Sequence, residues 1–192
     1  MPKEYEFRPD SAHTDSLDKI FLSQRQRFSL LRWTLYALFF LLGLIVQDVV
    51  LYRVDYLGGG TDLVPCIIFM ITALEGGETG SVFALLASLV YYFSGSAPGP
   101  YMIPAITFLA VFAAIFRQAC LPRGFFSILL CTTLSMVLYE LILFGMGVFL
   151  GNIPLSWLRP MMLTALLTQA ALPVCYPIAR VIGKIGGEVW KE

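Results

Sequence analysis

Long apolar stretches alternate with short polar links along this chain. The apolar stretches cover residues 28–52, 62–74, 79–93, 101–118, 124–150 and 157–182. A membrane-spanning helix needs about 17–25 mostly apolar residues, a length that every stretch reaches except 62–74 and 79–93. The pattern therefore predicts an all-α polytopic membrane protein with six transmembrane helices, of which the second and third are short.

Polar segments flank this predicted membrane domain, which we place at residues 28–185. Residues 1–27 mix both charges and are expected to form a cytoplasmic arm. No small-residue cleavage site follows the first apolar stretch, so we expect the mature protein to keep this arm rather than lose it as a secretory signal. Residues 186–192 are expected to form a short cytoplasmic tail.

The two short stretches are joined by the link Glu75-Gly-Gly-Glu-Thr-Gly80. At about 1.5 Å per residue each would form a helix of about 20 Å, shorter than the roughly 30 Å hydrocarbon core. Two interpretations stay open. Either both helices cross a thinned bilayer, or they form a re-entrant hairpin that holds Glu75 and Glu78 inside the membrane. A polar cytoplasmic turn is the simpler role for these glutamates than a cation or amine site.

Local signals predict two further details. Thr61-Asp62 is expected to cap the start of the second stretch, with Pro65 in its first turn. Pro173 and Pro177 predict a kink in the last stretch, because each removes a backbone donor.

The basic residues predict the orientation. With six spans, the side that holds both termini collects Lys3, Arg8, Lys19, Arg25, Arg27, Arg32, Arg117, Arg123, Arg180, Lys184 and Lys191. The other side holds Arg53 and Arg159. Because loops rich in Lys and Arg stay in the cytoplasm, we expect both termini to be cytoplasmic.

Composition excludes several function classes. Apolar residues make up 58% of the chain and charged residues 14%, whereas soluble domains average about 25% charged residues. The 13 basic and 13 acidic residues balance, which disfavours a nucleic-acid partner. His13 stands alone and the cysteines lack ligand spacing, so no metal or cofactor site is predicted. With no catalytic motif in the sequence, we do not expect an enzyme.

Three ionisable residues are candidate intramembrane functional groups. Glu140 lies well inside the fifth stretch, where it is expected to act as a charged group or to form a buried hydrogen bond, for example with Gln169. In the hydrogen-bonding case, Gln should replace Glu140 and Leu should not. Asp48 is expected to reach lipid headgroups or Arg53, and Arg159 could be drawn toward an outer polar pocket.

A stripe of small residues, Gly80, Ala84 and Ser88, repeats at the four-residue spacing that lets membrane helices approach closely. Packing within the chain is the simpler interpretation. Recruitment of a partner helix is the alternative.

From about residue 63 onward the chain resembles the MreD family of the bacterial rod-shape system. The resemblance lies in the Pro65-led stretch, the glycine-bearing hairpin and the phrase Leu89-Val-Tyr-Tyr-Phe-Ser-Gly-Ser-Ala-Pro-Gly99. The motif of this phrase comprises the loop residues Ser94, Gly95, Ser96 and Gly99, and Tyr91 stands where the family usually has aspartate. Two further features resemble those of the family: the basic residue Arg117 at the end of the fourth apolar stretch, and the last stretch with Pro173.

This resemblance implies a non-enzymatic scaffold of six spans in the bacterial cytoplasmic, or inner, membrane. Such a scaffold binds single-span MreC and helps couple MreB to RodA and its penicillin-binding transpeptidase partner in peptidoglycan synthesis. The alternative is a substrate-binding S component of an energy-coupling-factor vitamin transporter, whose six-helix fold MreD proteins resemble. An S component needs an outer pocket lined by convergent polar groups.

Overall fold

The computed structural model describes residues 24–51, 60–120, 124–151 and 154–185, so most of the expected arm and the whole tail lie outside the described residues. Within these ranges the chain is helical and has no strand, which confirms the all-α prediction. The helices are α2 (Gln24–Val49), α3 (Leu63–Glu75), α4 (Gly77–Phe93), α5 (Met102–Cys120), α6 (Phe125–Phe149), the 3-10 turn η2 (Leu155–Trp157), α7 (Leu158–Gln169) and α8 (Leu172–Gly183).

Several of these helices indicate a membrane protein. Three of them, α2, α5 and α6, are long and apolar enough to cross a membrane, and the bent pair of α7 and α8 is a fourth if it counts as one span. Helices α3 and α4 have only 13 and 17 residues. The structure therefore supports three to four spans, and the count of six stays a prediction.

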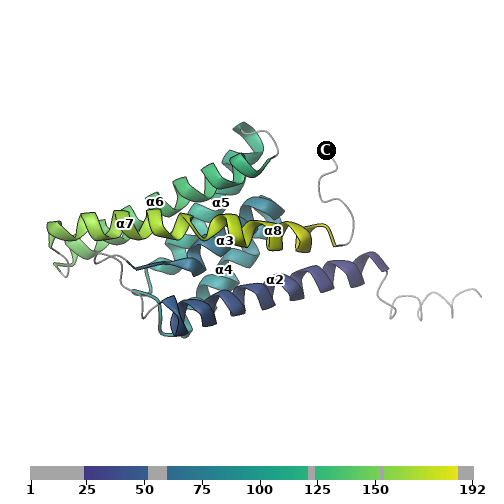
Figure 1. Ribbon diagram of the computed structural model, residues 1–192, viewed down its shortest axis with the longest axis horizontal. Coiled ribbons are helices and arrows are strands. Elements are labelled where there is room, and N and C mark those ends of the chain that lie inside the picture. The colour runs from purple at the N-terminus through teal and green to yellow at the C-terminus, as the bar shows by residue number, and fades with distance from the viewer. Residues whose placement is uncertain (1–23, 52–59, 121–123, 152–153, 186–192) are drawn as a thin grey trace, which may run out of the picture.

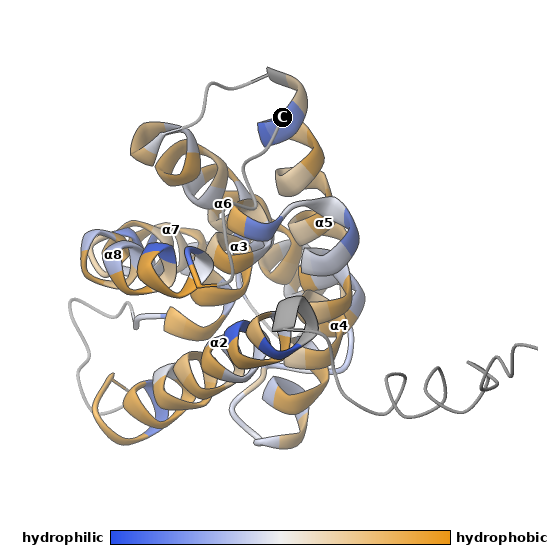
Figure 2. Ribbon diagram, turned by 90° about the vertical axis from the view of Figure 1, so that its right-hand side faces the viewer, coloured by the Kyte–Doolittle hydropathy of each residue, from blue (hydrophilic) through white to orange (hydrophobic). Residues whose placement is uncertain are grey.

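Helix α3 lies at the centre of the bundle. Every residue from Leu63 to Leu74 is buried, and α3 packs against α2, α4, α5, α6, α7 and α8. Figure 2, viewed from the end where α2 begins, places α3 among the surrounding helices. A helix that is apolar all round is expected in such a position. Because α3 touches protein on every side, its length of about 20 Å need not match the bilayer thickness.

Two apolar clusters meet at α3. One joins α3 to α4, α5 and α6, and in it the Phe69 and Tyr139 rings pack edge to face with centroids 6.2 Å apart. The other joins α3 to α2 and α8, with Ile67 beside Tyr36 and Ala179. In Figure 1, α2 and the α7–α8 pair run along the long axis of the molecule.

The small-residue stripe lies inside the chain. Gly80, Ala84 and Ser88 are all buried on one face of α4. A Cβ atom added to Gly80 would lie 2.9 Å from the Thr72 Cα atom of α3, and the Thr72 hydroxyl donates a hydrogen bond of 3.2 Å to the Gly80 carbonyl. Glycine at position 80 therefore sets the close approach of α3 and α4, and the stripe packs helices within the chain.

The predicted kink in the last apolar stretch is present as a bend of 48° between α7 and α8. Pro173 is the second residue of α8. It has no N–H to donate to the Gln169 carbonyl one turn earlier, so the helix breaks between these residues. Pro177, by contrast, lies inside α8.

We expect Gly80→Ala to destabilise the protein. The added methyl meets the α3 backbone, and overpacking of this kind costs about 1–3 kcal/mol, more than the roughly 1 kcal/mol that alanine gains in helix propensity. The apparent Tm in detergent should fall by several degrees. Gly145→Ala in α6 is the matched control, because nothing lies within 4 Å of its added Cβ. Equal Tm values for the two variants would contradict the proposed close contact.

Candidate functional site

Polar side chains gather at the two ends of α3. At its N-terminal end, Gln47, Asp62, Tyr91 and Thr168 form what we call the Asp62 cluster. At its C-terminal end, Arg32, Tyr36, Glu75 and Arg117 form what we call the Glu75 cluster. Each cluster connects α3 to helices that are distant in the sequence.

The Asp62 cluster is a closed hydrogen-bond network. The Gln47 Nε2 atom donates to Asp62 Oδ1 at 3.1 Å and to the Tyr91 hydroxyl at 3.2 Å. Tyr91 in turn donates to Asp62 Oδ1 at 3.2 Å. Gln47 also accepts a hydrogen bond from the Val64 backbone N–H at 2.8 Å through its Oε1 atom. One α2 amide thereby satisfies both the Asp62 carboxylate and the first turn of α3.

The expected capping role of Asp62 is only partly correct. Asp62 occupies the N-cap position of α3, but its side chain makes no capping hydrogen bond because the carboxylate faces Gln47 and Tyr91. Its backbone N–H instead donates to the Thr168 hydroxyl of α7 at 2.9 Å.

The sequence does not predict this cluster as a unit. Its signals were Gln47, which interrupts an apolar stretch, and Tyr91, which stands where the resemblance to the MreD family leads one to expect aspartate. Neither signal indicates that the two side chains meet, because they lie 44 residues apart in the chain.

Glu140 is buried in α6, with 3% of its surface exposed. The expected hydrogen bond with Gln169 is absent: Gln169 Oε1 accepts from the Thr133 hydroxyl at 3.0 Å, and Gln169 Nε2, the atom that could donate to a carboxylate, has no partner among the described residues. Among the described residues, neither Glu140 Oε1 nor the neighbouring Tyr139 hydroxyl has a hydrogen-bond partner. Both lie within electrostatic reach of Asp62.

Asp48 connects α2 to the loop that carries the MreD-like motif. Its Oδ1 atom accepts a hydrogen bond of 2.7 Å from the Ser96 hydroxyl, a protein partner that the sequence did not indicate. The alternative partner, Arg53, lies outside the described residues.

The motif residues Ser94, Gly95, Ser96 and Gly99 form the turn between α4 and α5. The Ser94 hydroxyl donates to the Tyr91 carbonyl at 2.7 Å. Gly95 has φ +81°, a conformation that favours glycine, and a Cβ atom at Gly99 would strike the Tyr101 ring. Backbone geometry thus accounts for both glycines.

Arg159 stands apart from the other candidate residues. It is exposed near the start of α7, beside a surface depression of about 480 Å³ that Met162 and Leu166 help to line. No hydrogen bond or ion pair joins it to Glu140 or Asp48 in the part of the chain that the structure describes.

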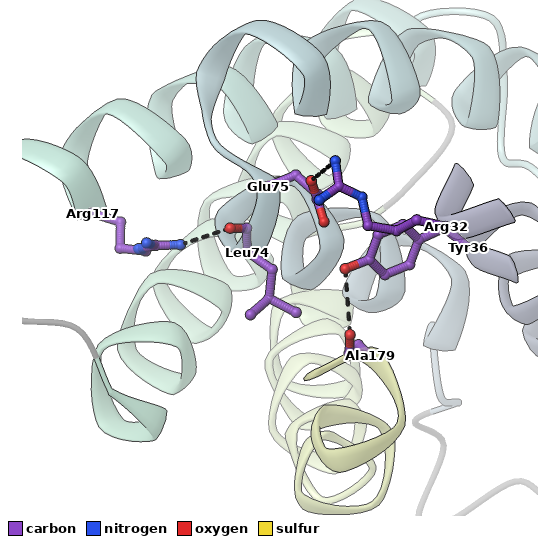
Figure 3. A network of polar contacts seen from close by, with 6 residues as sticks. All are labelled: Arg32, Tyr36, Leu74, Glu75, Arg117 and Ala179. Atoms are coloured by element: carbon purple, nitrogen blue, oxygen red, sulfur yellow. Dashed lines mark hydrogen bonds and ion pairs between the residues drawn. The ribbon is translucent and has the colours of Figure 1, made fainter. Parts of the chain in front are cut away.

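The Glu75 cluster holds the other end of α3 (Figure 3). Arg32 Nη2 lies 3.2 Å from Glu75 Oε2, with the two side chains 13% and 2% exposed. Arg117 Nη1 donates to the Leu74 carbonyl at 3.3 Å. Tyr36 donates to the Ala179 carbonyl of α8 at the same distance, 3.3 Å. Glu75 is therefore a buried ion-pair partner and not part of a solvated turn, whereas Glu78 is exposed.

Basic helix ends meet at this cluster. Arg32 from α2 and Arg117 from α5 contact the C-terminal end of α3. Helix α8 ends beside them, since a Cβ atom on Gly183 would lie 3.8 Å from Glu75 Oε1. Arg180 and Lys184 are close to Gly183 in the chain. The fold thus brings Arg32 and Arg117, two of the residues predicted to be cytoplasmic, to the same end of α3.

A third feature is an apolar groove of about 640 Å³ between α2 and α4. We call it the α2–α4 groove. Phe83 lies beneath it and packs against Trp33 and Phe40, with ring centroids 5.9 and 6.2 Å apart. The lining residues are Trp33, Ala37, Phe40, Leu41, Glu78, Thr79, Val82, Phe83, Leu86, Ala87 and Val90.

No known protein family, curated protein or solved structure matches this chain. Over the described ranges, no group of three or more His, Cys, Asp or Glu side chains is placed to hold a metal ion.

We expect the Arg32–Glu75 pair to show strong coupling. Arg32→Met leaves a buried carboxylate without its counter-charge, which typically costs about 3–5 kcal/mol. The double variant Arg32→Met/Glu75→Met should lose less stability than Arg32→Met alone, measured as apparent Tm in detergent. Arg180→Met is the control, because Arg180 is exposed. Simple additivity of the single-variant losses would contradict the coupling.

We expect Asp62→Leu to lower the apparent Tm more than Asp62→Asn. Leucine leaves the Gln47 and Tyr91 donors unsatisfied, at about 1–3 kcal/mol, whereas asparagine keeps an acceptor oxygen. Glu140→Leu is the comparison, and it should be tolerated because Glu140 makes no hydrogen bond with the described residues. A larger loss for Glu140→Leu than for Asp62→Leu would reverse this assignment.

Proposed function

We propose that this chain is an MreD-like scaffold subunit of the bacterial cell-elongation complex. It lies in the cytoplasmic membrane with both termini in the cytoplasm, binds the single membrane helix of MreC, and through it associates with MreB, RodA and the penicillin-binding transpeptidase. The observation that carries the proposal is the α2–α4 groove, an apolar surface that no described helix of this chain fills.

The lining of the groove suits a helix. The lining combines the small residues Ala37 and Ala87 with the aromatic side chains of Trp33, Phe40 and Phe83. Small residues let a second backbone approach, and in lipid such close packing is the main attraction between helices. Helix α2 also leaves much of its surface uncovered, because only 22% of its most apolar window is buried.

The arrangement of the polar groups supports a role in protein–protein contact rather than in catalysis or transport. In the Asp62 cluster, Gln47 and Tyr91 direct their donors at Asp62, so these side chains satisfy one another. A catalytic or transport site would instead direct such donors and acceptors into a cavity.

One observation favours the S-component alternative. The Tyr139 hydroxyl and Glu140 Oε1 are buried without a hydrogen-bond partner among the described residues, and both lie near Asp62. Polar atoms of this kind suit a small bound molecule. Mass spectrometry of small molecules extracted from the purified protein separates the two functions, because a scaffold carries no stoichiometric ligand.

Blocking the groove should release the partner. We expect Val82→Trp to lower the MreC recovered with the tagged protein from native membranes by about tenfold, which corresponds to about 1.4 kcal/mol. Val174→Trp on α8 is the matched control, because Val82 and Val174 are 59% and 67% exposed and only Val82 lines the groove. Equal recovery with both variants would count against the groove. Recovery of ATPase subunits and a vitamin-like ligand would overturn the scaffold.

A further inference from the structure

We infer that Glu78 selects the partner helix of the α2–α4 groove by pairing with a Lys or Arg at the cytoplasmic end of that helix. The inference rests on the proposed function and names the chemistry that the groove recognises.

Glu78 marks one end of an otherwise apolar surface. It lies in the first turn of α4, where the α3–α4 hairpin closes the groove. Apart from its neighbour Thr79, the other described lining residues are apolar or aromatic. A helix in the groove would therefore meet a single charged side chain, that of Glu78. This charge would lie beside the end of the helix that is nearest the α3–α4 hairpin.

The Glu78 carboxylate is available. Glu78 is exposed, and its side chain forms no ion pair with any described residue. The nearby Ser81 hydroxyl donates a hydrogen bond to the Glu78 backbone carbonyl and not to the carboxylate. Arg32, from the facing helix α2, instead pairs with Glu75.

Charge complementarity identifies the occupant. A membrane helix whose end lies in the cytoplasm usually carries Lys or Arg there, so a single-span helix with its basic end at the hairpin would bring a cation to Glu78. The same carboxylate would repel an anionic phospholipid. If the acyl chains of such a lipid filled the groove, its headgroup would lie beside Glu78. The inference therefore commits to a protein helix with a basic inner end.

Charge reversal tests this pairing. In native membranes with tagged protein, we expect Glu78→Lys to reduce recovered MreC by at least about tenfold, because like charges placed together at an interface are strongly unfavourable. Changing the basic residue nearest the cytoplasmic end of the MreC membrane helix to Glu should restore recovery with Glu78→Lys. Phe126→Lys is the control, because Phe126 is 81% exposed at the start of α6 and lines neither the α2–α4 groove nor the depression beside α5 that Glu78 shares with Gln118.

Each result separates the inference from the proposed function. Loss with Val82→Trp but not with Glu78→Lys would overturn the role of Glu78 and leave the groove as the MreC site. Loss with Glu78→Lys that no MreC charge change restores would also overturn the pairing. A cysteine at position 78 that crosslinks to a second copy of this chain, and not to MreC, would replace the partner helix with a homodimer.

Discussion

The enclosure of α3 is the constraint on which the rest of the structure depends. With Leu63 to Leu74 buried, the six neighbouring helices must supply all its contacts. In lipid, apolar surface gains little by leaving the solvent, so tight packing and satisfied polar groups must hold such a helix. Gly80 provides the tight packing against α4. The Asp62 and Glu75 clusters satisfy polar groups at the two ends.

The sequence predicted the helices well because hydropathy reports burial in lipid or protein. The apolar stretch at 62–74 agrees with α3 at Leu63–Glu75 to within one residue at each end. Pro173 likewise predicted the break before α8, since a missing backbone donor is a local property. Hydropathy did not reveal that α3 is surrounded by protein, because lipid and protein interiors select similar side chains.

The polar contacts were harder to predict. The Asp62 cluster combines residues from α2, α4 and α7 with the residue before α3, and their meeting depends on how each helix is rotated about its axis. For Glu75 the sequence leaves two positions open, a polar cytoplasmic turn and a re-entrant hairpin inside the membrane, and its glycine-rich surroundings favour the turn. Its burial depends on Arg32, which belongs to helix α2 and is distant from Glu75 in the sequence.

The two clusters also restrict how the protein can move. A slide of α3 along its own axis by one residue, about 1.5 Å, would stretch the bonds of Asp62 at one end and those of Leu74 and Glu75 at the other. A piston motion is therefore blocked. Because Gln47 and Arg32 both belong to α2, the same contacts also hold α2 at a fixed axial position beside α3.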